Sequence, residues 1–111
     1  MEEIWKVIPN YEDYKVSNRG RVMSCKLKNP IILKPQKRVK GYVFVALCKE
    51  KSRAKFIDIH RLVLMAFVGM PPDGKECDHI NRIRDDNRLE NLRWVTKVEN
   101  EANKLRKTSS K

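Results

Sequence analysis

A carboxylate and an imidazole stand side by side at Asp78 and His79, and two asparagines follow them at Asn91 and Asn100. A neutral imidazole can take a proton from water near pH 7, whereas carboxylate and carboxamide oxygens suit a hard divalent cation such as Mg²⁺. Together these residue types can assemble a one-metal site that hydrolyses phosphodiester bonds. An Asp-His pair alone would be more simply explained as an ion pair at a strand end, so the surrounding sequence has to decide.

The segment that carries these residues predicts a strand, a long polar loop, a second strand and a helix, over residues 76–80, 93–95 and 97–104. Neighbouring side chains on a strand point to opposite faces, so Asp78 and His79 diverge unless the strand bends or ends there. Asn100, one turn into the helix, is expected to pack back over the strand as the second metal ligand. Glu99 and Asn103 are neighbours that could be mistaken for it.

A helix is predicted immediately before this segment. The apolar positions 59, 62, 63, 66 and 67 have the spacing of an amphipathic helix, which Gly69 and the prolines at 71 and 72 then stop. His60 lies off this apolar stripe, and a surface or capping histidine, which could still touch the DNA backbone, is favoured over a catalytic one.

Residues 4–58 have the rhythm of short strands separated by turns, which indicates an antiparallel sheet. The clearest strand covers 42–48, and the polar residues 49–53 connect it as a hairpin to 55–58. Basic residues flank this strand densely, and they are either a solvated face or a surface that contacts phosphates. The fold class expected is therefore α+β, with a small N-terminal antiparallel sheet followed by a helix and the strand-loop-strand-helix unit.

Several phrases of the chain resemble the HNH endonucleases of phages and group I introns. They are residues 76–80, 86–96 and 98–100, the upstream segments 59–63 and 66–68, and, for an N-terminal module often fused to that family, residues 4–9, 11, 14, 16–18 and 20–22. The resemblance implies a ββα-metal nuclease unit that cuts double-stranded DNA with one divalent ion, most simply Mg²⁺, with Mn²⁺ as an alternative. It implies His79 as general base, Asp78 and Asn100 as metal ligands, and Asn91 as a brace between loop and strand.

The chain also departs from the family pattern. Asp86 and Asn87 stand where a paired Asn-Asn is common, and Asn81-Arg82 replaces the commoner Asp-Gly. Many relatives continue into a helical DNA-reading segment, whereas here only a short basic stretch, 105–111, follows the motif. The division expected is residues 1–58 as the β-rich DNA-contacting module, 59–104 as the nuclease module and 105–111 as a basic tail.

DNA contacts are expected from two sets of cations. They are Lys49, Lys51, Arg53 and Lys55 in the hairpin, and Arg82, Arg84, Arg88 and Arg93 in the nuclease motif, which the sequence does not rank.

The overall composition agrees with a polyanionic partner. The formal net charge is +11 and the pI about 9.8, although ribosomal and membrane-surface proteins share such values. The three cysteines, Cys25, Cys48 and Cys77, form no C-x₂-C pair, so neither a disulfide framework nor a zinc ribbon is indicated. No export signal or membrane span is expected, which favours a cytoplasmic protein. One site in a monomer would nick one strand, whereas a double-strand break would require a homodimer or two successive visits, and the sequence does not choose between them.

Two other classes of function remain open. A module that keeps the fold but only binds DNA would lack cleavage, against which the complete set of Asp78, His79, Asn91 and Asn100 argues. A structural zinc protein using His79 with the three cysteines would lack the usual paired spacing of ligands.

Overall fold

The computed structural model describes residues 2–49 and 52–109. Its N-terminal half contains two antiparallel sheets, one built in chain order from β1 (Trp5–Ile8), β2 (Tyr11–Ser17), β3 (Val22–Ser24) and β4 (Ile31–Ile32), the other from β5 (Gln36–Lys37), β6 (Val43–Leu47) and β7 (Lys55–Asp58). After them come α1 (Ile59–Phe67), β8 (Lys75–His79), the short 3₁₀ helix η1 (Leu89–Asn91), β9 (Leu92–Thr96) and α2 (Lys97–Ser109).

The α+β class and the order of elements are confirmed, but the N-terminal strands form two sheets where one was expected. The break falls between β4 and β5, where Pro35 has no N–H to donate to a ladder. The hairpin of β6 and β7 pairs as predicted, with Val45 opposite Ile57 and Leu47 opposite Lys55.

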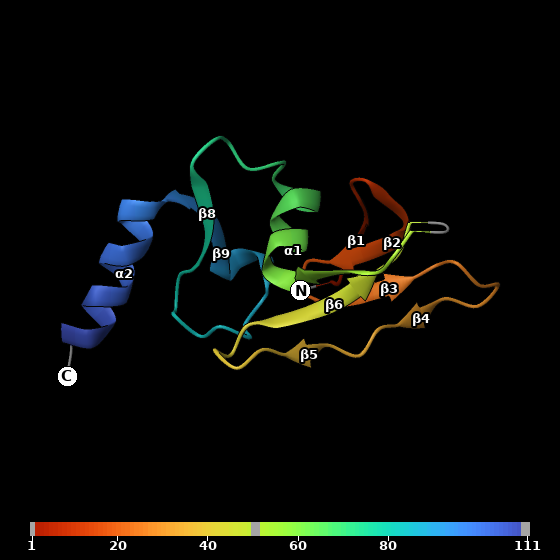
Figure 1. The fold of residues 1–111 in the computed structure, drawn as a ribbon, viewed down its shortest axis with the longest axis horizontal. Coiled ribbons are helices and arrows are strands. Elements are labelled where there is room, and N and C mark those ends of the chain that lie inside the picture. Colours follow the sequence, from red (N-terminus) through yellow and green to blue (C-terminus); the bar gives the residue numbers. More distant parts are fainter. Residues whose placement is uncertain (1, 50–51, 110–111) are drawn as a thin grey trace.

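Helix α1 lies at the centre of the molecule, between the N-terminal sheets and the β8–β9 hairpin (Figure 1). It covers the predicted residues and buries Ile59, Leu62 and Val63. The helix ends at Phe67, and Gly69 two residues later stops it, with a φ of 129° and its N–H donated to the carbonyl of Leu64 over 2.9 Å. Such a conformation favours glycine, so the sequence sets the end of the helix.

One hydrophobic core joins the two halves of the chain. Ile8, Val16 and Val45 from the N-terminal sheets belong to the same buried cluster as Leu62 of α1 and Leu92 of β9. Fully burying each such side chain stabilises the fold by about 1.5–3 kcal/mol. The strands that precede α1 therefore support the unit that follows it.

Strands β8 and β9 pair antiparallel, with Asp78 opposite Arg93 and His79 opposite Leu92. Helix α2 then begins with a capping box, in which the Thr96 N–H donates to Glu99 Oε1 (2.8 Å) and the Glu99 N–H donates to Thr96 Oγ1 (3.1 Å). This cap fixes the first turn of α2 over β8.

Helix α2 is longer than predicted. It continues past residue 104 to Ser109, so most of the expected basic tail is helical backbone. Residues 105–107 are Leu, Arg and Lys, all good helix formers, and neither glycine nor proline interrupts them. Within the described part of the chain, no helix is both long and apolar enough to cross a membrane.

Candidate active site

The alternation of β8 divides its side chains between two helices. Glu76 and Asp78 face α2 and are bonded by its asparagines, whereas His79 packs against His60 of α1. The strand ends at His79, and the next N–H, that of Ile80, donates to the carbonyl of Asn91 over 2.8 Å. Because the strand ends there, Asp78 and His79 still line one small cavity of about 40 Å³, enough to admit a water molecule.

The ring of His79 is held by Asn87. His79 Nε2 lies 2.7 Å from Asn87 Oδ1, and because a carboxamide oxygen only accepts hydrogen bonds, this ring nitrogen carries the hydrogen. In the neutral ring, Nδ1 is then the basic nitrogen. Burial lowers the pKa of His79 below its ordinary value of 6.5, partly opposed by the bond to Asn87, so the imidazole is neutral near pH 7.

Two further rings surround His79. The centroid of His60 lies 4.9 Å from that of His79, and the centroid of Tyr42 lies 5.8 Å from it, with Tyr42 and His60 themselves 5.3 Å apart. The expectation of a surface or capping His60 is wrong, because its side chain is buried in this cluster. The pKa of His60 is lowered to about 4, mainly by burial and secondly by the neighbouring His79. His60 is therefore also neutral near pH 7.

The carboxylate of Asp78 is buried and has two partners. Arg93 Nε donates to Asp78 Oδ2 over 2.9 Å from the facing strand, and Asn103 Nδ2 lies 3.1 and 3.3 Å from the two oxygens. Asn100, the predicted metal ligand, lies over β8 as expected and lines the same cavity. Its own amide nitrogen donates to Glu76 Oε1 over 2.8 Å. Asn103 therefore contacts Asp78 directly, and Asn100 lies beside them.

The loop between β8 and η1 is closed by Asn91. Its Oδ1 accepts from the Asn81 N–H over 2.9 Å, and its Nδ2 donates to the Asp86 carbonyl over 2.8 Å. Arg82, which stands where glycine is common in the family pattern, has a φ of 65°. The loop thus keeps a glycine-like turn, at a cost of roughly 1–2 kcal/mol for a residue with a Cβ.

The four arginines of the motif have different surroundings. Arg82 and Arg84 line the cavity, and Arg84 also lies over the ring of Tyr42, 4.9 Å from its centroid. Arg93 pairs with Asp78. Arg88 donates to both oxygens of Asp86 (2.8 Å each), which lowers the pKa of that carboxyl to about 2. Arg88 and Arg93 are thus each paired with a carboxylate, and Arg82 and Arg84 are the two of these arginines that line the cavity.

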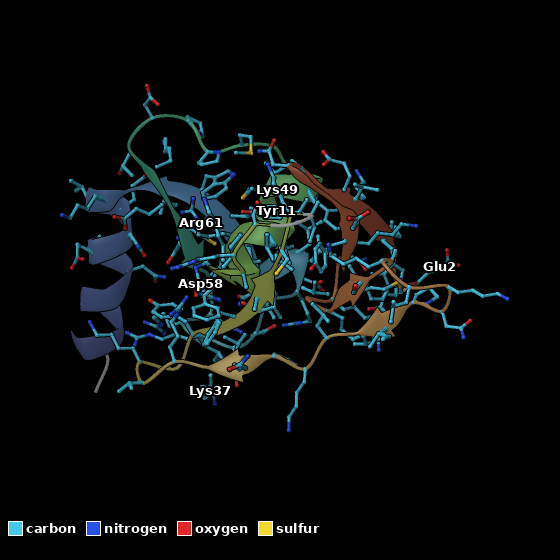
Figure 2. All side chains as sticks on the ribbon, turned by 45° about the vertical axis from the view of Figure 1, so that its right-hand side comes forward. Glu2, Tyr11, Lys37, Lys49, Asp58 and Arg61 are labelled. Carbon is cyan, nitrogen blue, oxygen red and sulfur yellow. The ribbon has the colours of Figure 1, made fainter. Side chains whose placement is uncertain are left out.

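The basic hairpin lies away from this site. Lys49, Arg53 and Lys55 line a shallow hollow together with Tyr11, and Lys51 lies outside the described residues. Lys49 Nζ is 5.4 Å from the centroid of the Tyr11 ring, and Figure 2 shows the two side chains together. Strand β6 runs from the side of the β8–β9 unit toward the end of the molecule farthest from α2 (Figure 1). The two sets of cations are therefore spread along the long axis of the molecule.

The donor set near the cavity fits a hard divalent ion. Asp78 and Asn100 offer oxygen ligands, and Mg²⁺ is commonly held by one or two protein groups while it keeps several waters. Among residues 2–49 and 52–109, no group of three or more His, Cys, Asp or Glu side chains lies close enough together to hold a metal ion by itself. Burial raises the pKa of the Cys77 thiol to about 12, so the free thiol is protonated near neutral pH.

Several residues of the site were missed by sequence reasoning. Tyr42, His60 and Asn103 reach it only through tertiary packing, and Tyr42 comes from the N-terminal half of the chain. The family pattern points to an asparagine at Asn87 but not to its contact with His79. One local signal was available, because Thr96-x-x-Glu99 is the sequence signature of a capping box and fixes where α2 begins.

A buried carboxylate and a neutral, oriented histidine on a ββα unit form the arrangement expected of an HNH-type nuclease. Comparison with family models agrees, since residues 58–102 match the HNH endonuclease model and residues 3–48 match the NUMOD4 motif. The chain belongs to the HNH endonuclease family, with a NUMOD4 motif before the nuclease domain. HNH endonucleases generally use a divalent metal ion.

Individual relatives agree with this assignment. The chain is 43% identical to an uncharacterized HNH endonuclease of Acanthamoeba polyphaga mimivirus over 102 residues, which cover 88% of this chain and 25% of the relative. It is 38% identical to DNA endonuclease I-HmuI of Bacillus phage SP01, covering 91% of this chain and 57% of that protein. A solved structure described as DNA binding and cleavage by the HNH homing endonuclease I-HmuI superimposes with a TM-score of 0.83 over 97% of this chain and 60% of the other. The chain thus spans at most about three fifths of these relatives.

Proposed function

We propose that this protein is a metal-dependent DNA endonuclease that hydrolyses phosphodiester bonds, with His79 as the general base. The observation that carries the proposal is the His79–Asn87 hydrogen bond of 2.7 Å beside the buried Asp78. It places the ring hydrogen on Nε2 and leaves Nδ1 to accept a proton from water. Such a positioned base accelerates a reaction by about 10²–10⁴-fold.

The residues of this chain divide the remaining work. Asp78 and Asn100 would hold the divalent ion, most simply Mg²⁺, with Mn²⁺ as an alternative. A metal ion held there supplies electrostatic stabilisation of the departing 3′ oxygen. Asn103 holds the carboxylate of Asp78 from α2, and Asn91 keeps the loop closed around the site. Arg82 and Arg84, which line the cavity, would bind the phosphates on either side of the scissile one, and Arg93 holds Asp78 from the facing strand.

The substrate we propose is double-stranded DNA. The +11 charge favours a polyanion, and the related I-HmuI is named a DNA endonuclease. The hairpin cations and the site arginines lie along one long molecule, whose longest extent is 50 Å. That length spans more than one turn of a duplex, so both sets could contact the same DNA.

Supercoiled plasmid tests the proposal directly. Incubation with Mg²⁺ or Mn²⁺ should convert it to nicked or linear forms, and EDTA should abolish the conversion. His79→Ala should retain DNA affinity in a gel-shift assay but lose most cleavage. A protein that binds DNA but never cuts it under any of these conditions would be a binding module with a nuclease fold.

A further inference from the structure

Two carboxylate–carboxamide pairs join strand β8 to helix α2. Asn100 Nδ2 donates to Glu76 Oε1 over 2.8 Å, and Asn103 Nδ2 lies 3.1 Å from Asp78 Oδ1. Residues two apart on a strand share a face, and residues three apart on a helix share a face. The pairing therefore follows from the register between the two elements, which the capping box at Thr96 and Glu99 fixes.

The direction of each hydrogen bond decides what each asparagine can do. An ionised carboxylate accepts hydrogen bonds only, so each asparagine must present its nitrogen to its acid. Asn103 places that nitrogen against both oxygens of Asp78 and against the carbonyl of His79 (3.3 Å). Its amide oxygen is thereby turned away from the carboxylate, so Asn103 acts as a support of Asp78.

Asn100 is arranged differently. Its nitrogen is bound by Glu76, a carboxylate farther from the strand end, and its side chain lines the cavity together with Asp78 and His79. Because the nitrogen is fixed, the rotation of the carboxamide is fixed too, and the oxygen is the atom left for a cation. Glu76 is half-buried, so solvent competes only partly for this bond.

We propose that Glu76 is a positioning residue, which holds the carboxamide of Asn100 so that Oδ1 faces the divalent metal bound by Asp78. The inference rests on the proposed function, since it takes Asn100 as a ligand. Groups that orient a metal ligand typically contribute about 10–100-fold to metal affinity. Glu76 acts through its hydrogen bond and does not touch the metal itself.

Titration of the full chain with Mn²⁺, followed by the EPR signal of the free ion, tests this without any need for cleavage. Glu76→Ala should raise the Kd for Mn²⁺ by about 10–100-fold. Glu76→Gln keeps an oxygen that accepts from Asn100, so it should stay within about twofold of the wild type. Glu90→Gln, which removes an exposed carboxylate of the 3₁₀ helix, is the matched control and should change nothing.

Further variants separate the possible failures. If Glu76 acts through Asn100, Glu76→Ala should add little to the effect of Asn100→Ala in the double variant. A Glu76→Gln protein that binds Mn²⁺ as weakly as Glu76→Ala would overturn the inference, because the negative charge or direct coordination would then matter. If Asp78→Ala weakens binding and Glu76→Ala does not, only the role of Glu76 fails. If Asp78→Ala also leaves Mn²⁺ binding unchanged, the proposed metal site itself fails, and the inference with it.

Discussion

Gly20 and Asn87 are in contact across the two halves of the chain. A Cβ placed on Gly20 would lie 2.8 Å from the Asn87 Cβ and 2.9 Å from its carbonyl oxygen, and Gly20 itself has a φ of 85°. Next to this contact, the Leu89 N–H donates to the carbonyl of Asn18 over 2.8 Å. The turn between β2 and β3 therefore supports the residue that orients His79.

Gly20→Ala should for this reason lower both stability and cleavage. The added Cβ has no room beside backbone atoms, and a positive φ is unfavourable for alanine by roughly 1–2 kcal/mol. Thermal unfolding measures the first effect, and plasmid nicking at a temperature where the variant is folded measures the second. Gly74→Ala is the control, because Gly74 also has a positive φ (78°) but no atom lies within 4 Å of its Cβ position. If Gly20→Ala loses no more activity than Gly74→Ala, the contact does not support the site.

The pH dependence of cleavage should report the buried His79. Its pKa is lowered by burial, and the base acts only when neutral, so activity should stay constant from pH 8 down to about 6.5 and fall only below that. Asn87→Asp places a carboxylate against the ring, which favours the protonated form and should move the acid limb to higher pH. Initial rates of nicking at fixed, saturating Mg²⁺, measured across the pH range, would show the acid limb of the wild type and that of the variant. An acid limb above pH 6.5 in the wild type would contradict a base with a lowered pKa.

Much of this fold follows from local sequence, and much of the site does not. The apolar spacing of 59–67 and the β-branched run before it predict α1 and the β6–β7 hairpin, because periodicity records which face is buried. His60 shows the limit of the method. It lies off the apolar stripe, yet Tyr42 and His79 cover it from elements distant in sequence. The separate roles of Asn100 and Asn103 likewise depend on how α2 sits on β8, which no local pattern contains.

Arg82→Gly should separate phosphate binding from loop structure. Arg82 already has a φ of 65°, a conformation that glycine adopts without strain, so the loop should keep its shape. Relief of strain and the greater freedom of glycine in the unfolded chain should offset each other to within about 1 kcal/mol. At low salt, the variant should bind DNA more weakly than the wild type, as measured by fluorescence anisotropy. Its melting temperature should barely change. Unchanged affinity would mean that Arg82 does not contact DNA.

Stability should decrease in mild acid because of His60. Its pKa in the folded protein is about 4, below the ordinary 6.5, so the unfolded chain binds more protons between these values. The free energy of unfolding is therefore unaffected by the titration of His60 above pH 6.5. It decreases as the pH falls from 6.5 toward 4, by up to about 3 kcal/mol. Urea unfolding at several pH values measures this slope. His60→Phe keeps an aromatic ring and should flatten the plot of unfolding free energy against pH. A smaller slope should remain, because His79 contributes in the same direction. An equally steep plot in this variant would rule out His60 as the cause.

The basic hairpin offers a test of where the duplex lies. Lys49, Arg53 and Lys55 line one hollow at the end of β6 and the start of β7, and Lys51 lies between them in sequence. If these four contact phosphates, replacing all of them by Gln should weaken binding and reduce the slope of log K against log[salt] by about 0.9 for each lost contact. Saturating enzyme should still cut, because the proposed catalytic residues lie on β8 and α2.

A control with the same loss of charge makes this result specific. Gln at Lys6, Lys28, Lys75 and Lys97, which lie on other parts of the chain, lowers the net charge by the same amount. Contacts at the hairpin predict a larger change of slope for the hairpin variant than for this control, measured by anisotropy across a salt series. Equal changes in the two variants would instead mean that only the net charge matters and that the hairpin makes no phosphate contacts of its own.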